Sequence, residues 1–196
     1  MVVLIGAILA AGVRFLTRYE GSVDGTALPQ FSWRWNAKPA AADLPSIPDA
    51  TAVAADLGDL PAGVADFPRY MGLVGDGVVP DTGIQTDWKS HQPREVWRIP
   101  VGLGWAGFSV AGRRAVTQEQ RGDDEYVTCY DIATGKLVWG HKDAVRFSEG
   151  MGGDGPRATP TIDVEKKLVY SLGATGILNC LDLATGQKKW GRNILT

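Results

Sequence analysis

Short apolar runs of four to six residues alternate with turn residues along the second half of the chain. The runs are rich in β-branched and aromatic residues and are bounded by Gly, Asp and Thr, a pattern that is typical of short β-strands. They fall into two sets of four, with bounds 106–110, 114–118, 125–130 and 136–139, then 159–162, 167–171, 176–181 and 187–190. Each set predicts a meander of four antiparallel strands.

Apolar residues occupy both faces of the strand predicted near residue 180. Leu178 and Cys180 point to one side while Ile177 and Leu181 point to the other, because side chains alternate along a strand. A strand that is apolar on both faces needs cover on both faces. We therefore expect the predicted sheets to stack face to face.

One motif occurs twice, as Cys-x-Asp-x-Ala-Thr-Gly-x-x-x-Trp at 129–139 and again 51 residues later at 180–190. The Asp can accept backbone N–H groups of a hairpin turn, and the Gly supplies the positive φ that such a turn requires. The predicted structural positions of the repeat are Asp131, Thr134, Gly135, Trp139, Asp182, Thr185, Gly186 and Trp190. We assign them to turn formation and packing rather than to catalysis.

A repeat of this length is typical of β-propellers, in which each blade is a four-stranded meander. The run 95–99 carries Trp97 and resembles a further outer strand without its neighbours. The prediction is an all-β partial propeller of two four-stranded blades plus this orphan outer strand. Two blades cannot close a ring, because stacked repeats bury their faces only against neighbours. We expect the chain to be the N-terminal part of a longer protein.

The repeated motif resembles the tryptophan-docking motif of the pyrroloquinoline-quinone (PQQ)-like β-propeller family, over residues 95–196. That family includes quinoprotein alcohol dehydrogenases and an outer-membrane assembly lipoprotein. The resemblance implies that Trp139, Trp190 and Trp97 each dock on a neighbouring blade. It also implies a membrane-anchored bacterial protein with its propeller in the periplasm or otherwise outside the cytoplasm.

The N-terminal run Met1–Val13 contains no charged residue before Arg14. It is short for a bilayer, which requires about 20 residues, and its basic residues follow the run rather than precede it as in a signal peptide. Three interpretations stay open: the end of a transmembrane helix, an uncleaved anchor, or a buried segment. Basic residues after the run favour a cytoplasmic C-terminal side, against the placement that the family implies.

Three regions are predicted along the chain: a hydrophobic membrane segment at 1–18, a membrane-proximal segment and linker at 19–66, and propeller repeats at 67–196. The aromatic run 31–35 suits either an interfacial membrane anchor or an ordinary strand. The stretch 36–66 is rich in Ala, Pro and Asp, which predicts a disordered linker. The segment from Phe67 resembles the lead-in to the first blade and should pack on the propeller.

Charge and cysteine content exclude some classes of function. The chain has 20 basic and 22 acidic residues, and a net charge of −2 argues against a nucleic-acid partner. Cys129 and Cys180 hold the same position in successive repeats, too far apart for a disulfide, so we expect two free thiols.

Candidate ligand-binding residues lie in two polar regions. The run 150–155 fits G-x-G-x-x-G, but Pro156 follows where a nucleotide-binding helix would begin. This region holds an insertion, and Arg157, Asp154 and Thr159 are its candidate ligand- or partner-facing residues. The run 118–125 has four carboxylates but lacks the spacing of a calcium loop, so we predict a solvated hairpin, with Glu119 as a further candidate. No catalytic set and no metal site are predicted, because His91 and His141 are isolated.

The resulting functional hypothesis is a non-catalytic propeller module that binds or scaffolds. Its partners would be another protein or the remaining blades of the same propeller, with membrane attachment through the N-terminus and no cofactor. The alternative is part of a PQQ- and Ca²⁺-dependent dehydrogenase whose active-site residues lie largely outside this chain. A sensor domain of a larger membrane protein is a third class.

Overall fold

The computed structural model describes residues 15–21, 30–35, 44–47, 65–79, 83–149 and 152–196. Within these residues the chain forms ten strands, β1 to β10. It divides into two compact units, the first comprising 1–43 with 148–154 and the second 44–147 with 155–196.

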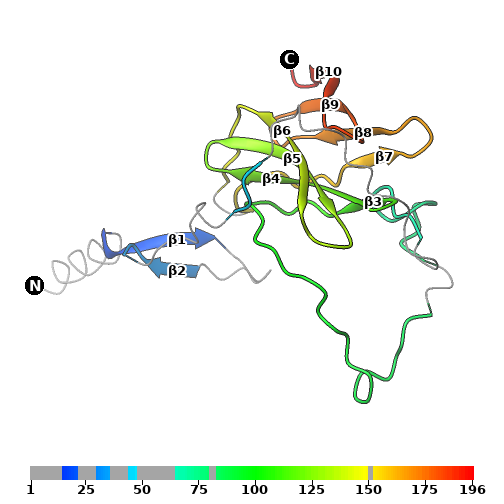
Figure 1. The fold of residues 1–196 in the computed structure, drawn as a ribbon. Coiled ribbons are helices and arrows are strands. Elements are labelled where there is room, and N and C mark those ends of the chain that lie inside the picture. The colour runs from blue at the N-terminus through cyan, green and yellow to red at the C-terminus, as the bar shows by residue number, and fades with distance from the viewer. Residues whose placement is uncertain (1–14, 22–29, 36–43, 48–64, 80–82, 150–151) are drawn as a thin grey trace, which may run out of the picture. The chain divides into compact units, whose positions relative to one another are not determined.

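Two four-stranded antiparallel sheets make up the second unit (Figure 1). Blade 1 consists, in order across the sheet, of β3 (Ser109–Ala111), β4 (Arg114–Arg121), β5 (Asp124–Asp131) and β6 (Leu137–Asp143). Blade 2 consists in the same order of β7 (Thr161–Asp163), β8 (Leu168–Leu172), β9 (Ile177–Asp182) and β10 (Lys188–Asn193). The predicted all-β fold with two four-stranded meanders is confirmed.

Strand β3 is shorter than the predicted run 106–110. The backbone upstream of Ser109 pairs elsewhere: Leu103 exchanges hydrogen bonds with Gln120, and the Gly107 N–H donates to Thr159 Oγ1 at 3.1 Å. The chain before β3 therefore continues along the inner side of blade 1 without forming a regular ladder with β4.

The hydrophobic core lies between the facing sides of the two blades, as the two-sided apolar strands predicted. Blade 1 contributes residues that include Val116, Cys129 and Trp139, and blade 2 contributes Val169 and Leu181. Four of these five side chains are at most 1% exposed and Trp139 is 3% exposed. Burial of this apolar surface is the main favourable contribution that holds one sheet against the other.

Trp139 joins the outer edge of blade 1 to the turn after β9. Its Nε1 donates a hydrogen bond to the Leu183 carbonyl at 3.0 Å, and its ring lies against Gly186. A Cβ at Gly186 would come within 2.5 Å of the indole Cε3, and the residue has a φ of +72°. Only glycine satisfies both the turn and the approach of the indole.

Trp97 makes the same contact with blade 1. Its Nε1 donates to the Ile132 carbonyl at 2.8 Å, and a Cβ at Gly135 would lie 2.8 Å from the ring. Residues 95–99 have no strand partner within the described part of the chain. Trp97 nevertheless contacts blade 1 through its hydrogen bond to Ile132. The equivalent Trp190 of blade 2 is 47% exposed.

The Asp and Thr of each motif build the turn that receives the tryptophan. In blade 1 the Asp131 carboxylate accepts the Ala133 N–H at 3.1 Å and the Thr134 hydroxyl at 2.8 Å, and its carbonyl accepts the Gly135 N–H at 2.7 Å. Asp182 makes the matching contacts in blade 2, including one from the Thr185 hydroxyl at 3.1 Å. The predicted turn role of these residues agrees with this geometry.

The segment from Phe67 packs on the blades, as predicted. Phe67 exchanges two backbone hydrogen bonds with Val110 of β3, at 2.8 and 2.9 Å, and the Pro68 carbonyl accepts the Ile162 N–H of β7 at 2.7 Å. Asp66 accepts the Gly112 N–H at 2.9 Å. One short strap therefore satisfies backbone groups on the inner strands of both blades.

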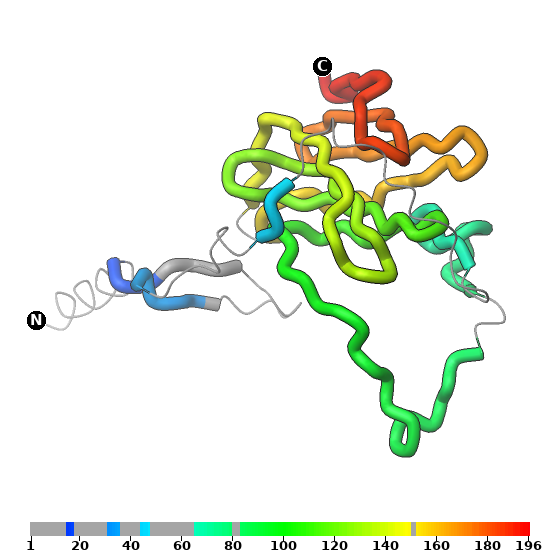
Figure 2. Tube along the Cα trace, in the orientation of Figure 1, coloured from blue at the N-terminus to red at the C-terminus, as the bar shows by residue number. Residues whose placement is uncertain are grey.

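Residues 44–47 of the predicted linker run beside blade 1 (Figure 2). The Pro45 carbonyl accepts a hydrogen bond from Arg121 Nη1 at 2.5 Å, and the Ile47 side chain packs against Gly140. The expectation of a disordered linker was therefore wrong for 44–47, because an arginine fixed on the sheet supplies a donor for its backbone. The rest of the predicted linker, 36–43 and 48–64, lies outside the described residues.

The first unit contains the antiparallel hairpin of β1 (Thr17–Gly21) and β2 (Gln30–Trp33). The strand interpretation of the aromatic run 31–35 is thus confirmed for its first three residues. No helix in the described ranges is long and apolar enough to cross a bilayer, and the predicted membrane segment Met1–Val13 lies outside them.

We predict that Gly186→Ala destabilises the second unit for two reasons, the positive φ at residue 186 and a clash of the new methyl group with Trp139. The left-handed backbone costs an alanine about 1–2 kcal/mol, and the clash with Trp139 adds about 1–3 kcal/mol. The free energy of unfolding, measured by urea titration, should therefore fall by about 2–5 kcal/mol.

Gly112→Ala is the matched control for this substitution. Gly112 also has a positive φ, +54°, but nothing lies within 4 Å of a Cβ at that position. It should lose only the conformational part, about 1–2 kcal/mol. Equal losses in the two variants would contradict the docking role of Trp139.

Candidate functional site

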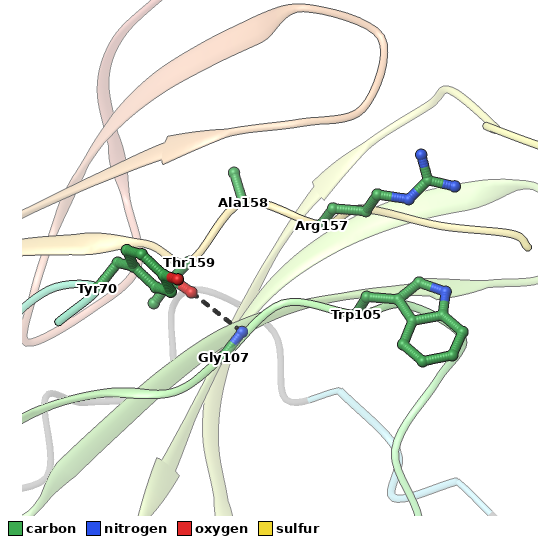
Figure 3. Close-up of a pocket in the computed structure, with 6 residues that line it drawn as sticks. All are labelled: Tyr70, Trp105, Gly107, Arg157, Ala158 and Thr159. Carbon is green, nitrogen blue, oxygen red and sulfur yellow. Dashed lines mark hydrogen bonds between the residues drawn. The ribbon is translucent and has the colours of Figure 1, made fainter. Parts of the chain in front are cut away.

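A shallow groove of about 570 Å³ lies where the chain enters the innermost strands of the two blades (Figure 3). It is lined by Tyr70, Trp105, Gly107, Arg157, Ala158 and Thr159. Residues 105–107 lead toward β3, and residues 157–159 lead toward β7. The groove is therefore a product of the stacking of the blades and exists in neither blade alone.

Two hydrogen bonds fix the walls of the groove. The Trp105 N–H donates to the Pro156 carbonyl at 2.8 Å, and the Gly107 N–H donates to Thr159 Oγ1 at 3.1 Å. A Cβ at residue 107 would stand 2.9 Å from that same oxygen, so glycine permits the close approach. The two lead-in segments are in this way held together by backbone donors.

The exposed groups of the groove are two aromatic rings and one cation. Trp105 is 55% and Tyr70 is 71% exposed, and the Arg157 guanidinium lies 5.4 Å above the centre of the Phe147 ring. Stacking on an aromatic ring orients a guanidinium without removing its charge. No carboxylate lines the groove, so its chemistry suits a neutral or anionic partner with apolar surface.

The structure brings together two of the four residues proposed as ligand contacts, Arg157 and Thr159. Asp154 lies in the loop 148–154, where its carboxylate accepts a hydrogen bond from the Ser148 hydroxyl at 2.7 Å, and it does not line the groove. Sequence reasoning missed Trp105 and Tyr70. The signal at Trp105 was a large aromatic directly after Gly104, outside any predicted strand.

Glu119, the fourth candidate, is buried at 1% exposure rather than open to a ligand. Its carboxylate accepts hydrogen bonds from the Tyr130 hydroxyl at 2.8 Å, from Arg121 Nη2 at 2.9 Å and from the Gly102 N–H. Burial alone would raise the pKa of Glu119, but these bonds outweigh it and lower the pKa. This network anchors Arg121, the residue that holds Pro45.

The prediction of a solvated hairpin at 118–125 holds at the turn, where Gly122 and Asp123 are exposed, but is wrong along the strands. The hairpin of β4 and β5 exists, yet Gln118, Glu119, Gln120 and Glu125 are all at most 5% exposed. Gln118 Nε2 donates to the Ala158 carbonyl, and Gln120 Oε1 accepts the Phe147 N–H. These polar side chains satisfy loop backbone between the strands instead of facing water.

A second polar cluster joins the outer part of blade 1 to blade 2. Glu125 accepts the Ala174 N–H at 3.2 Å, and Asp143 accepts Asn179 Nδ2 at 2.6 Å. Burial, followed by the charge of Asp143, raises the pKa of Glu125 despite the bond from Ala174. Burial would also raise the pKa of Asp143. The nearby His141 side chain, the hydrogen bond from Asn179 and the positive charge of Lys188 outweigh burial, so the pKa of Asp143 is lowered.

The cysteines are free and buried, as predicted from their equivalent positions. Burial raises the pKa of the Cys129 thiol to about 12, and it also raises the pKa of Cys180. A thiol with such a pKa holds almost no thiolate at neutral pH and is a poor nucleophile. In the described part of the chain, no three His, Cys, Asp or Glu side chains are grouped to hold a metal ion.

A second depression, of about 390 Å³, lies on the side of blade 2 that carries Trp190. It is lined by Leu178, Trp190, Gly191 and Arg192. Cys180 pairs with both Tyr170 and Trp190 across the sheet, and the Tyr170 and Trp190 ring centres are 6.1 Å apart. The pair Cys180 and Trp190 on this face of blade 2 is equivalent to the pair Cys129 and Trp139 of blade 1, which is buried.

Comparison with known proteins finds similarity among solved structures. No family model and no curated protein matches the chain. Among solved structures, the chain is similar to BamB from Moraxella catarrhalis, with 21% sequence identity and a TM-score of 0.19. The match covers 47% of this chain and 36% of that one, so the chain spans little more than a third of its length.

We predict that Glu125→Gln stabilises the second unit at neutral pH by about 1 kcal/mol, the scale of a poorly paired buried polar group. The folded pKa of Glu125 is raised, so its contribution is fully present below the unfolded carboxyl pKa and is lost as pH rises through the folded pKa. A glutamine keeps an acceptor for Ala174 without the charge. The gain in melting temperature should be present at pH 7.5 and absent at pH 4.

Glu119→Gln is the matched control, with the opposite sign. Its folded pKa is lowered, so the wild-type carboxylate stabilises the fold above the unfolded pKa, and that contribution is lost as pH falls. The variant leaves buried Arg121 without its charge partner and should cost about 3 kcal/mol at pH 7.5. Stabilisation by both variants, or by neither, would show that we have misassigned the two networks.

Proposed function

We propose that this chain is a non-catalytic PQQ-like β-propeller module that binds or scaffolds other protein surface while attached to a membrane. The assignment to this family rests on the doubled docking motif and on the contacts that its residues make. The propeller would stand on the extracytoplasmic side, and its partners would be another protein or further blades of the same propeller.

The observation that carries this proposal is the docking of tryptophan on a glycine turn. Trp97 and Trp139 each donate to the carbonyl that follows the motif Asp and each rest on a glycine with positive φ. Trp190 occupies the third such position and is 47% exposed beside Tyr170. Its natural occupant is a turn of the same sequence, Asp-x-Ala-Thr-Gly, presented by an adjoining blade.

The groove of Trp105 and Arg157 is the second surface of the proposed module. Interfaces between proteins are enriched in Trp, Tyr and Arg, the three large residues that this groove exposes. An extended peptide with an acidic or polar side chain would place its apolar atoms on Trp105 and its charge beside Arg157. The groove would thus contact a partner at the end of the blades, separately from the Trp190 face.

The alternative of a quinone-dependent dehydrogenase is not supported by the donors present. Calcium takes six to eight oxygen ligands, whereas the groove is lined by one phenol, one hydroxyl and no carboxylate. The blade 1 carboxylates Glu119 and Asp131 form ion pairs with Arg121 and Arg113. The groove therefore offers few oxygen ligands for calcium, which favours the scaffold proposal.

Duplication of blade 2 tests the docking proposal directly. A second copy of residues 146–196 fused after Thr196 preserves the 51-residue spacing of the repeat. The turn of the added copy should cover Trp190 in the same way that the turn with Leu183 and Gly186 covers Trp139. We then expect Trp190→Ala to cost about 3 kcal/mol of unfolding free energy in the fused protein, as for a core tryptophan.

The same substitution in the original chain is the control. There Trp190 is half exposed, so its loss should cost about 1 kcal/mol or less. Urea titration followed by circular dichroism measures both values. An equal effect of Trp190→Ala in the two proteins would mean that this face does not receive a blade of the repeat.

A separate experiment tests the enzyme alternative against the scaffold proposal. We expect no alcohol-dependent dye reduction, and no quinone absorbance retained through gel filtration, after PQQ and Ca²⁺ are added to the full chain. Reduction that requires both additions, and that is lost in Trp105→Ala and Arg157→Ala variants, would replace the scaffold proposal with a catalytic one.

A further inference from the structure

The β1–β2 hairpin exposes an unusual number of large apolar side chains for its size. Five of them are between 49% and 80% exposed: Phe15, Leu16, Phe31, Trp33 and Trp35. Soluble proteins rarely present contiguous apolar surface of this kind unless it contacts another molecule or a membrane.

The strand pairing gathers most of this surface at one end of the hairpin. Thr17 pairs with Trp33, and the Arg34 N–H donates to the Leu16 carbonyl at 2.9 Å, so the residues before β1 meet those after β2. The Trp33 and Trp35 rings stack with centroids 4.8 Å apart and planes inclined by 12°. The Arg34 Nε donates a hydrogen bond to the Thr17 carbonyl at 3.0 Å.

The sequence indicates what this aromatic end contacts. The uncharged run Met1–Val13 joins the hairpin at Phe15, which is at the same end as the stacked tryptophans. Tryptophan is enriched where a membrane-inserted segment meets the lipid headgroups, because its ring is apolar and its N–H is polar. Arg14, Arg18 and Arg34 supply the positive charge that anionic headgroups attract.

We infer that the aromatic end of the β1–β2 hairpin is an interfacial membrane anchor that sits among the lipid headgroups. This inference rests on the proposed membrane attachment and names the part of the chain that contacts the bilayer surface. The hairpin holds Trp33 and Trp35 at the level of the headgroups. The aromatic run 31–35 then serves as an anchor, and its first three residues also belong to β2.

Brominated lipids test the position of these tryptophans in the full chain. The protein is floated with vesicles of phosphatidylcholine and phosphatidylglycerol, with and without bromine near the upper part of the acyl chains. Bromine should quench the tryptophan emission of the wild type, and the Trp33→Ala/Trp35→Ala double variant should lose at least half of that quenching. Trp88→Ala is the control, since Trp88 is a 58% exposed tryptophan of the other unit, and its quenching should be unchanged.

The outcomes separate this inference from the membrane proposal itself. Vesicle-bound protein whose quenching is the same in the double variant would overturn the interfacial anchor and leave membrane attachment intact. Protein that does not float with vesicles would overturn both. Both replaced side chains are exposed, so an unchanged urea midpoint shows that the blades remain folded in every variant.

Discussion

The contact of an indole with a glycine turn is the constraint on which the arrangement of the blades depends. Each motif Gly must have positive φ to close its own turn, and it must lack a side chain to admit the ring of Trp97 or Trp139 from an earlier part of the chain. One residue therefore serves the fold of its own blade and the attachment of the neighbouring blade. Local turn formation and long-range packing are thereby coupled, which keeps the blades in a fixed register.

Polar residues between the strands add directionality to this apolar contact. Glu119, Arg121 and Tyr130 form one network within blade 1, and Glu125, Asp143 and Asn179 form another between the blades. Buried hydrogen-bonded groups penalise any arrangement that leaves them unpaired. The apolar core thus supplies stacking, while the polar groups restrict how one blade can turn or slide on the other.

The two proposed binding surfaces arise from different features of the same repeat. The Trp190 face is the exposed copy of an interface that the protein already makes once, so its chemistry can be read from Trp139. The groove around Trp105 and Arg157 forms where the segment that leads into blade 1 lies beside the segment that leads into blade 2. Repetition therefore accounts for the contact between the blades, and the two lead-in segments account for the groove.

The sequence by itself determined the strands, the turns and the docking tryptophans, because alternation of side chains and the Asp-x-Ala-Thr-Gly signal act over a few residues. It also named Arg157 and Thr159 as candidate ligand- or partner-facing residues. Only the tertiary structure decided that Glu119 is buried, that Leu44–Ile47 lies on blade 1 and that Tyr70 joins Trp105 in a groove. Those outcomes depend on contacts between residues that are far apart in the chain. A local pattern of charge or proline content carries no information about which distant donor, acceptor or ring will meet it.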